Sequence, residues 1–160
     1  MADTTTFEAT IEQTQPMTVA LQAFEGSYDL IPEGFKRLYG WIGPRGHDVS
    51  GPPMGVYLTS PPTPDAPARF EVWVPIEDAA TVFGPDESGL GIRQVDAMDV
   101  ARTRHVGPYD QIGRTYAKLQ QWIADHKYEI AGPPMEIYLS PPDTPPEKIT
   151  TEILIPVHEK

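Results

Sequence analysis

Carboxylates and aromatic rings recur at matched spacings in this 160-residue chain, in a pattern that suits the binding of an organic cation. A cation over an aromatic ring gains about 0.5–2 kcal/mol. A carboxylate about 4 Å away adds roughly 4 kcal/mol of Coulomb attraction before desolvation, at an effective dielectric near 20. The candidate ligand-binding residues are acids, rings and one large apolar group: Glu71, Trp73, Tyr57, Glu136, Tyr138, Glu152 and Leu154.

Several of these residues recur, Glu71 as Glu152 and Tyr57 as Tyr138, because the chain nearly repeats itself. Residues 17–76 align without a gap onto residues 98–157, and the best stretch sets GPPMGVYLTSPP against GPPMEIYLSPPD. Each copy ends in the pattern Glu-x-x-x-Pro, in FEVWVPI and in TEILIPV. We interpret the copies as two versions of one supersecondary unit related by a pseudo-twofold axis, joined by a linker at about 77–97.

Apolar periodicity predicts the order strand, helix, strand, strand in both copies. The second helix is marked by Ile112, Tyr116, Leu119 and Ile123 at helical spacing, and the first runs from residue 30 to about 42. We therefore expect an α+β fold: tandem β-α-β-β modules that form one antiparallel-sheet domain over 1–160, with a central ligand groove. The predicted strands cover 17–24, 54–58 and 70–76, and then 98–105, 135–139 and 151–157.

Side chains alternate between the two faces of a strand, and this decides which residues could line a groove. Phe70, Val72, Val74 and Ile76 form an apolar face that should meet a helix, which turns Glu71 and Trp73 the other way. The aliphatic residues of the short strands are assigned to the same helix side. This places Tyr57, Glu136 and Tyr138 on the same face as Glu71 and Glu152. In the alternative interpretation, these candidate groove residues lie on an ordinary solvent-facing side of an antiparallel sheet and bind nothing.

Composition excludes several classes of function. The formal net charge of −11 argues against a direct nucleic-acid partner, which would need a basic face. The chain has no cysteine for disulfides or thiolate metal sites, and its four histidines lack metal-ligand spacing, so we expect neither a metal nor a cofactor. His105 is interpreted as a packed strand residue. Without a signal peptide or a long apolar run, the expected location is the cytoplasm, with no membrane contact.

The order of the segments RHVGPYDQI, LQQWI, GPPMEIYLSPP and TEILIPV resembles the GyrI-like small-molecule-binding superfamily. This superfamily includes effector-binding domains of AraC-type and MerR-type multidrug regulators and stand-alone gyrase-inhibitor-like proteins. The resemblance covers about 17–157 and implies two β-α-β-β modules with ligand in the groove between them. It implies that Glu152 meets lipophilic cationic drugs, with Glu71 as its counterpart and Tyr138 and Tyr57 as pocket tyrosines. Because no helix-turn-helix segment is visible, we expect a stand-alone member.

Three functions remain open at this point. The first is a binding protein that holds lipophilic, cationic or aromatic drugs or toxins. The second is a cofactor-independent hydrolase of cyclopropane-bearing or other reactive toxins, in which Glu152 and Glu71 would divide acid and base roles. The third is a gyrase-inhibitor-like module that contacts another protein through its acidic surface.

Overall fold

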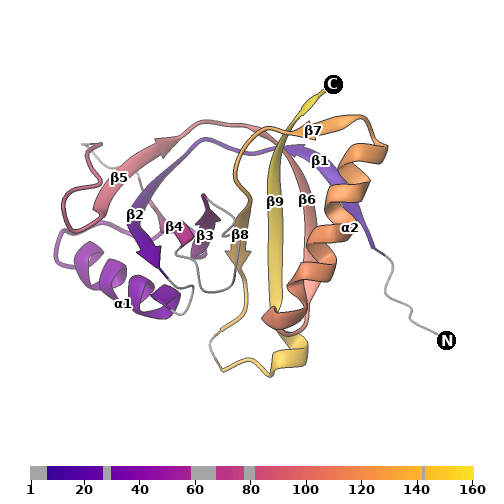
Figure 1. Ribbon diagram of the computed structural model, residues 1–160. Helices are drawn as coiled ribbons and strands as arrows, with labels where there is room; N and C mark the ends of the chain where they lie inside the picture. The colour runs from indigo at the N-terminus through magenta and orange to yellow at the C-terminus, as the bar shows by residue number, and fades with distance from the viewer. Residues whose placement is uncertain (1–6, 27–29, 59–67, 78–81, 142) are drawn as a thin grey trace. The chain divides into compact units, whose positions relative to one another are not determined.

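The computed structural model describes residues 7–26, 30–58, 68–77, 82–141 and 143–160 (Figure 1). The chain falls into two compact units. The first unit is Gln15–Ala97, and the second unit is Met98–Lys160 together with the N-terminal segment Met1–Thr14. Both combine a helix with antiparallel strands, so the predicted α+β class is confirmed. The duplication and its pseudo-twofold axis stay predictions.

The first unit pairs its strands in the order β3-β4-β2-β5. Helix α1, Ile31–Ile42, follows β2 in the chain and carries Pro32 in its first turn, where a missing N–H costs nothing. Leu38 and Ile42 of this helix pack in one buried cluster with Val72, Val74 and Ile76. The apolar face predicted for residues 70–76, which form β4, is therefore confirmed as the helix side. The strands are β2 Met17–Gly26, β3 Met54–Tyr57, β4 Ala68–Ile76 and β5 Leu90–Val95.

Strand β5 lies in the segment that we expected to be a linker, of which residues 78–81 fall outside the described residues. It pairs antiparallel with β2 along Met17–Gln22, and Phe83 bridges to Ile92. The residues GPDESGLG are typical of a turn, and an alternation typical of a strand begins at their end, in which Leu90 and Ile92 are buried on the helix side. The segment therefore adds an edge strand to the first unit.

The second unit pairs its strands in the order β1-β6-β9-β8, and the short β7 also pairs with β9. Leu119 and Ile123 of helix α2, Ile112–Asp125, pack in one cluster with Ile153, Ile155 and Val157 of β9. Thr14 exchanges hydrogen bonds with Met98, which ties the N-terminal segment to the start of this unit. The strands are β1 Ala9–Gln13, β6 Asp99–Val106, β7 Tyr128–Ile130, β8 Met135–Tyr138 and β9 Thr150–Glu159.

Two short 3-10 helices complete this unit: η2, Tyr109–Gln111, leads into α2, and η3, Pro146–Lys148, precedes β9. Neither α1 nor α2, nor any other helix in the described ranges, has the length and apolarity needed to cross a bilayer.

Gly34 gives a test of the packing between α1 and its sheet. A Cβ at this position would lie 2.3 Å from ring atoms of Phe24, whose ring stacks on Phe70. Gly34→Ala should therefore destabilise the protein by about 1–3 kcal/mol through overpacking, measured by urea unfolding. Gly40 is the matched control on the same helix, because a Cβ there meets nothing within 4 Å. Gly40→Ala should stabilise by roughly 0.5–1 kcal/mol; equal effects at the two positions would contradict this account.

Candidate functional site

The two glutamates of the long strands already bind arginines of their own unit. In the first unit, Glu71 Oε1 accepts hydrogen bonds from Trp73 Nε1 and from Arg93 Nη1, both at 2.8 Å. Arg93 Nη2 also lies 3.4 Å from Glu71 Oε2. The prediction that Glu71 and Trp73 lie together is thus confirmed. The guanidinium of β5 compensates the charge of Glu71, which is 6% exposed.

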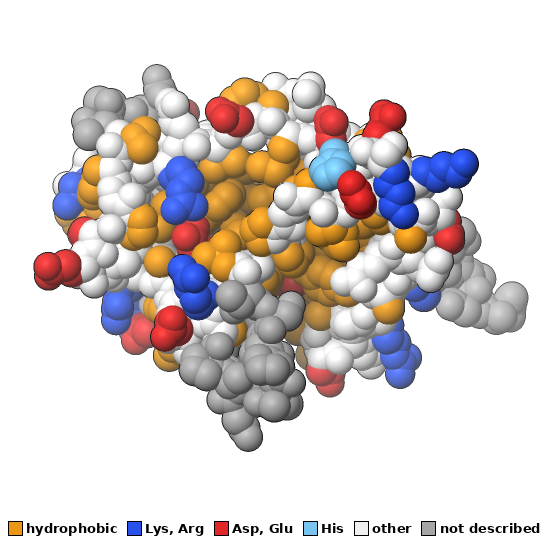
Figure 2. Space-filling model, turned by 45° about the horizontal axis from the view of Figure 1, so that its top comes forward, with side chains coloured by type: hydrophobic (Ala, Val, Ile, Leu, Met, Phe, Trp, Pro, Cys, Tyr) orange, Lys and Arg blue, Asp and Glu red, His pale blue; other side chains and the backbone are white. Residues whose placement is uncertain are grey.

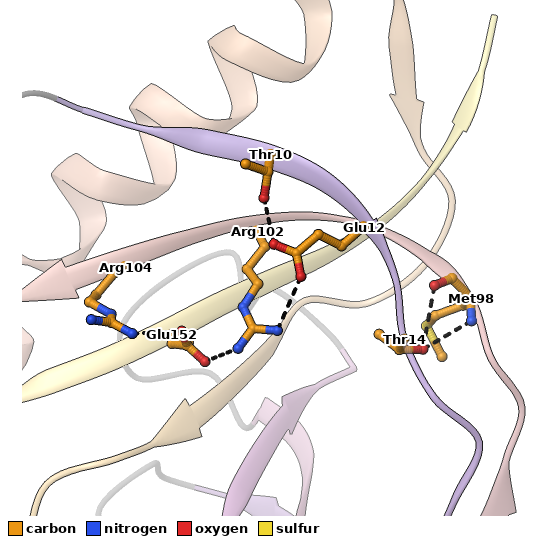
Figure 3. A network of polar contacts seen from close by, with 7 residues as sticks. All are labelled: Thr10, Glu12, Thr14, Met98, Arg102, Arg104 and Glu152. Carbon is orange, nitrogen blue, oxygen red and sulfur yellow. Dashed lines mark hydrogen bonds and ion pairs between the residues drawn. The ribbon is translucent and has the colours of Figure 1, made fainter.

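Glu152 in the second unit has the same kind of environment (Figure 3). Arg102 Nη2 donates to Glu152 Oε1, and Arg104 Nη2 donates to Glu152 Oε2 at 3.2 Å. Arg102 also reaches Glu12 of β1 at 3.5 Å, which extends the network across neighbouring strands. Leu154 lies on the same face of β9 and is buried. A carboxylate between two arginines is a weak attractor for another cation, because its charge is already compensated.

The predicted faces of the short strands were wrong. In β8, Ile137 lies opposite Glu152 in the antiparallel register, and in β3 Val56 lies opposite Glu71. Directly opposed residues point to the same face of a sheet. The aliphatic residues therefore share the face of the glutamates, and the residues between them turn to the helix side: Tyr57 in the first unit, and Glu136 and Tyr138 in the second.

On the helix side of the second unit, three tyrosines gather around an acid. We call Tyr109, Tyr116, Glu136, Tyr138 and Thr151 the tyrosine cluster. The Tyr116 hydroxyl, from α2, donates a 2.6 Å hydrogen bond to Glu136 Oε2. The Tyr109 and Tyr138 rings meet edge to face, with centroids 6.1 Å apart and an interplanar angle of 86°. Thr151 of β9 lies opposite Tyr138 in the ladder, so four elements contribute to the cluster.

The charge of Glu136 contributes to the raised pKa of Tyr109. Burial raises the pKa of Tyr109 above its ordinary value of 10.0, contact with the Thr151 hydroxyl lowers it, and the negative charge of Glu136 raises it further. Tyr109 therefore remains a protonated donor at neutral pH. The Thr151 hydroxyl influences this proton, yet its oxygen makes no hydrogen bond of good geometry within the described chain and is completely buried.

The cluster has the chemical groups that suit a flat or bulky organic cation. Glu136 is 6% exposed and supplies a carboxylate, and the tyrosine rings supply faces that attract positive charge. Tyr109 is 48% exposed, so the cluster reaches the surface of the protein. Hydrogen bonding by Tyr116 holds the carboxylate in one orientation. The described residues contain no group of three or more acids, histidines or cysteines that could hold a metal.

Sequence reasoning found Glu136 and Tyr138 but missed three members of the cluster. Tyr116 was assigned to the core stripe of a helix, and Tyr109 and Thr151 were not singled out. For Tyr116 and Thr151 one available signal was the alignment of the copies, because the second copy has polar groups where the first has apolar residues or glycine; Tyr109 aligns with Tyr28 and gives no such signal. The aligned pairs are Phe35 and Tyr116, Gly55 and Glu136, and Phe70 and Thr151.

One comparison with known proteins identifies a family. The model of the GyrI-like small molecule binding domain matches residues 7–158. A search of curated proteins finds no match. Among solved structures, the fold is similar to EcmrR in an EcmrR–DNA complex, with a TM-score of 0.82 and 19% identity over 96% of this chain. This chain spans only 58% of that EcmrR chain. The separate EcmrR C-terminal domain matches with a TM-score of 0.76 and 20% identity, covering 96% of this chain and 99% of that one.

Two further structures share the fold. A hydrolase from Listeria innocua matches with a TM-score of 0.72 and 17% identity, over 94% of this chain and 92% of the hydrolase. SAV2435 bound to tetraphenylphosphonium matches with a TM-score of 0.60 and 14% identity, over 94% of each chain. At these identities the similarity establishes the fold alone.

The arginine network of the second unit should be structural. Glu152→Gln keeps the size of the side chain but removes the charge between Arg102 and Arg104. It should lower the free energy of unfolding by about 1–2 kcal/mol, a reduced value because both arginines are partly exposed to solvent. The matched control is Glu12→Gln, at the exposed end of the same network, which should change stability by less than about 0.5 kcal/mol. Urea unfolding measures both; a neutral Glu152→Gln would contradict the structural role.

The ionisation of Tyr109 tests the cluster directly. Glu136→Gln should lower the pKa of Tyr109 toward its ordinary value, because one of the two causes that raise it is removed. The folded protein keeps this proton to a higher pH than the unfolded chain. The stability from Tyr109 is therefore complete below pH 10 and is lost as pH rises through the folded pKa.

Ultraviolet difference titration against Tyr109→Phe isolates this group from the other tyrosines. Glu152→Gln, which lies on the opposite face of the sheet, is the control and should leave the titration of Tyr109 unchanged. A shift of the same size in both glutamine variants would show that Glu136 does not act on Tyr109 locally.

Proposed function

The chain belongs to the GyrI-like family of small-molecule-binding domains, and we propose that it binds lipophilic organic cations at the tyrosine cluster of its second unit. The observation that carries this proposal is the buried Glu136 carboxylate, held by the Tyr116 hydroxyl and close enough to Tyr109 to raise the pKa of that phenol. A buried acid among aromatic rings favours a cation whose charge is spread over apolar groups.

A charge contact and ring contacts would both contribute to binding at this site. A cation about 4 Å from a carboxylate gains roughly 4 kcal/mol at an effective dielectric near 20, and each favourable ring face adds about 0.5–2 kcal/mol. At Glu71 and Glu152 a new cation would also meet the guanidinium groups that bind these acids. Their binding to arginine supports a structural role for Glu71 and Glu152. The proposed ligand contact is assigned to Glu136 and Tyr138 because this carboxylate lies among tyrosine rings.

The surface charge favours the same class of ligand. The net charge of −11 attracts cations over a distance and raises their local concentration. Figure 2 shows acidic and basic side chains mixed on one face, with apolar side chains exposed between them, so the excess charge is not a uniform layer. Long-range attraction is thus general, and selectivity must come from a local site. The tetraphenylphosphonium bound to SAV2435 is a lipophilic cation and supplies a suitable probe.

Calorimetric titration with tetraphenylphosphonium tests the proposal. Wild type should bind the probe, and Glu136→Gln should weaken binding by roughly 1–3 kcal/mol, less than the full Coulomb term because desolvation opposes it. Glu152→Gln is the matched control and should bind like wild type once its folded fraction is confirmed.

A neutral ligand of similar shape, triphenylphosphine oxide, separates charge from packing. Its affinity should change little in Glu136→Gln, because the substitution preserves the size of the side chain. An absence of tetraphenylphosphonium binding to wild type would refute the proposed ligand class. Weakening by Glu152→Gln but not by Glu136→Gln would move the site to the other face of the sheet.

A further inference from the structure

His105 is a buried strand residue that links three segments around the tyrosine cluster. It is 6% exposed, and it lies opposite Thr151 in the ladder between β6 and β9. Its Nε2 is 3.0 Å from the Pro108 carbonyl oxygen, and its Nδ1 is 2.8 Å from Thr115 Oγ1. A carbonyl oxygen only accepts hydrogen bonds, so Nε2 carries the proton toward Pro108. In the neutral ring, the Thr115 hydroxyl then donates to Nδ1.

The Pro108 carbonyl belongs to the peptide group that leads directly into Tyr109. The same oxygen accepts the backbone N–H of Gln111 at 3.1 Å, so two donors hold the peptide plane. The preceding Gly107 has a φ of 130°, a conformation that favours glycine, and its N–H donates to the Ile149 carbonyl at 2.8 Å. The chain therefore turns sharply off the end of β6 and is held there by an imidazole from that strand.

We propose that His105 is a positioning residue: by holding the Pro108 carbonyl, it fixes where the Tyr109 ring enters the tyrosine cluster and meets Tyr138. Thr115 anchors the other ring nitrogen to α2, so the orientation of the imidazole is set by the helix. The effect on ligand binding rests on the proposed function of the cluster. The effect on Tyr109 itself does not require any ligand.

The first unit shows that this polar arrangement is not needed to fill the space between helix and sheet. Phe24 occupies the position aligned with His105, and its ring stacks on Phe70 with centroids 5.3 Å apart. Gly34, aligned with Thr115, leaves room for the Phe24 ring. The second unit replaces an apolar stack by hydrogen bonds with defined directions, and these hydrogen bonds lead to Tyr109.

Two substitutions separate positioning from packing. His105→Leu removes both hydrogen bonds and keeps an apolar side chain of moderate size. His105→Gln retains an N–H donor of suitable reach for the Pro108 carbonyl. Thr115→Val removes the hydroxyl at the other nitrogen and leaves the bond to Pro108 in place. Circular dichroism and urea unfolding establish that each variant is folded before its site is measured.

The first readout is the titration of Tyr109, followed by NMR of ring-labelled tyrosine with the signal identified in Tyr109→Phe. Burial and Glu136 raise the pKa of Tyr109 in the wild type. If the ring leaves its place in His105→Leu, its pKa should fall toward the ordinary value. His105→Gln should keep the raised pKa, and Thr115→Val should lie between them. An unchanged Tyr109 titration in folded His105→Leu would overturn the proposal.

The second readout is affinity for tetraphenylphosphonium. His105→Leu should weaken binding by about two- to tenfold, the range expected for one displaced aromatic contact, and His105→Gln should restore most of it. In a Tyr109→Ala background, His105→Leu should have no further effect on binding. An equal loss in that background would show that His105 does not act through Tyr109. If wild type does not bind the probe, the proposed ligand class fails, whereas the Tyr109 titration still decides the role of His105.

Discussion

In both units, the antiparallel register between the last long strand and the short strand before it decides which side chains meet the helix. Pairing Ile137 with Glu152 sends Glu136 and Tyr138 under α2, and pairing Val56 with Glu71 sends Tyr57 to the side of α1. A shift by one residue would reverse every one of these placements. The tyrosine cluster depends on this register more than on any single hydrogen bond, because the register determines which acid can meet the tyrosines.

The two faces of the second unit each hold a buried glutamate. Glu152 is held by two arginines, and its interaction stabilises the pairing of β6 with β9. Glu136 accepts a hydrogen bond from the Tyr116 hydroxyl on the helix side, and its charge raises the pKa of Tyr109. Similar burial of the two carboxylates therefore does not imply similar function. The groups that surround each carboxylate differ, and on this difference rests the proposal that Glu152 stabilises the sheet and Glu136 attracts a ligand.

Much of the fold could be predicted from the sequence, because apolar periodicity reports burial directly. The stripe with Leu119 and Ile123 predicted α2, and the alternation from Phe70 to Ile76 predicted the helix face of β4. The faces of β3 and β8 could not be predicted by the same rule. In each short strand both sets of alternating residues contain large apolar or aromatic groups, so periodicity does not choose between them. Only pairing with the neighbouring strand resolves the choice, and that is a long-range property.

The candidate acids on the long strands were chosen because they occur at both of the aligned positions. Glu71 and Glu152 recur, and both neutralise arginines on adjacent strands, which is a requirement that each sheet must meet by itself. Glu136 and His105 stand where the first copy has Gly55 and Phe24. A group needed once per molecule, such as the acid in a single ligand site, has no reason to recur. Polar residues that differ between aligned positions therefore need the same attention as those that match, since the tyrosine cluster contains both kinds: Glu136 aligns with Gly55, whereas Tyr109 and Tyr138 align with Tyr28 and Tyr57.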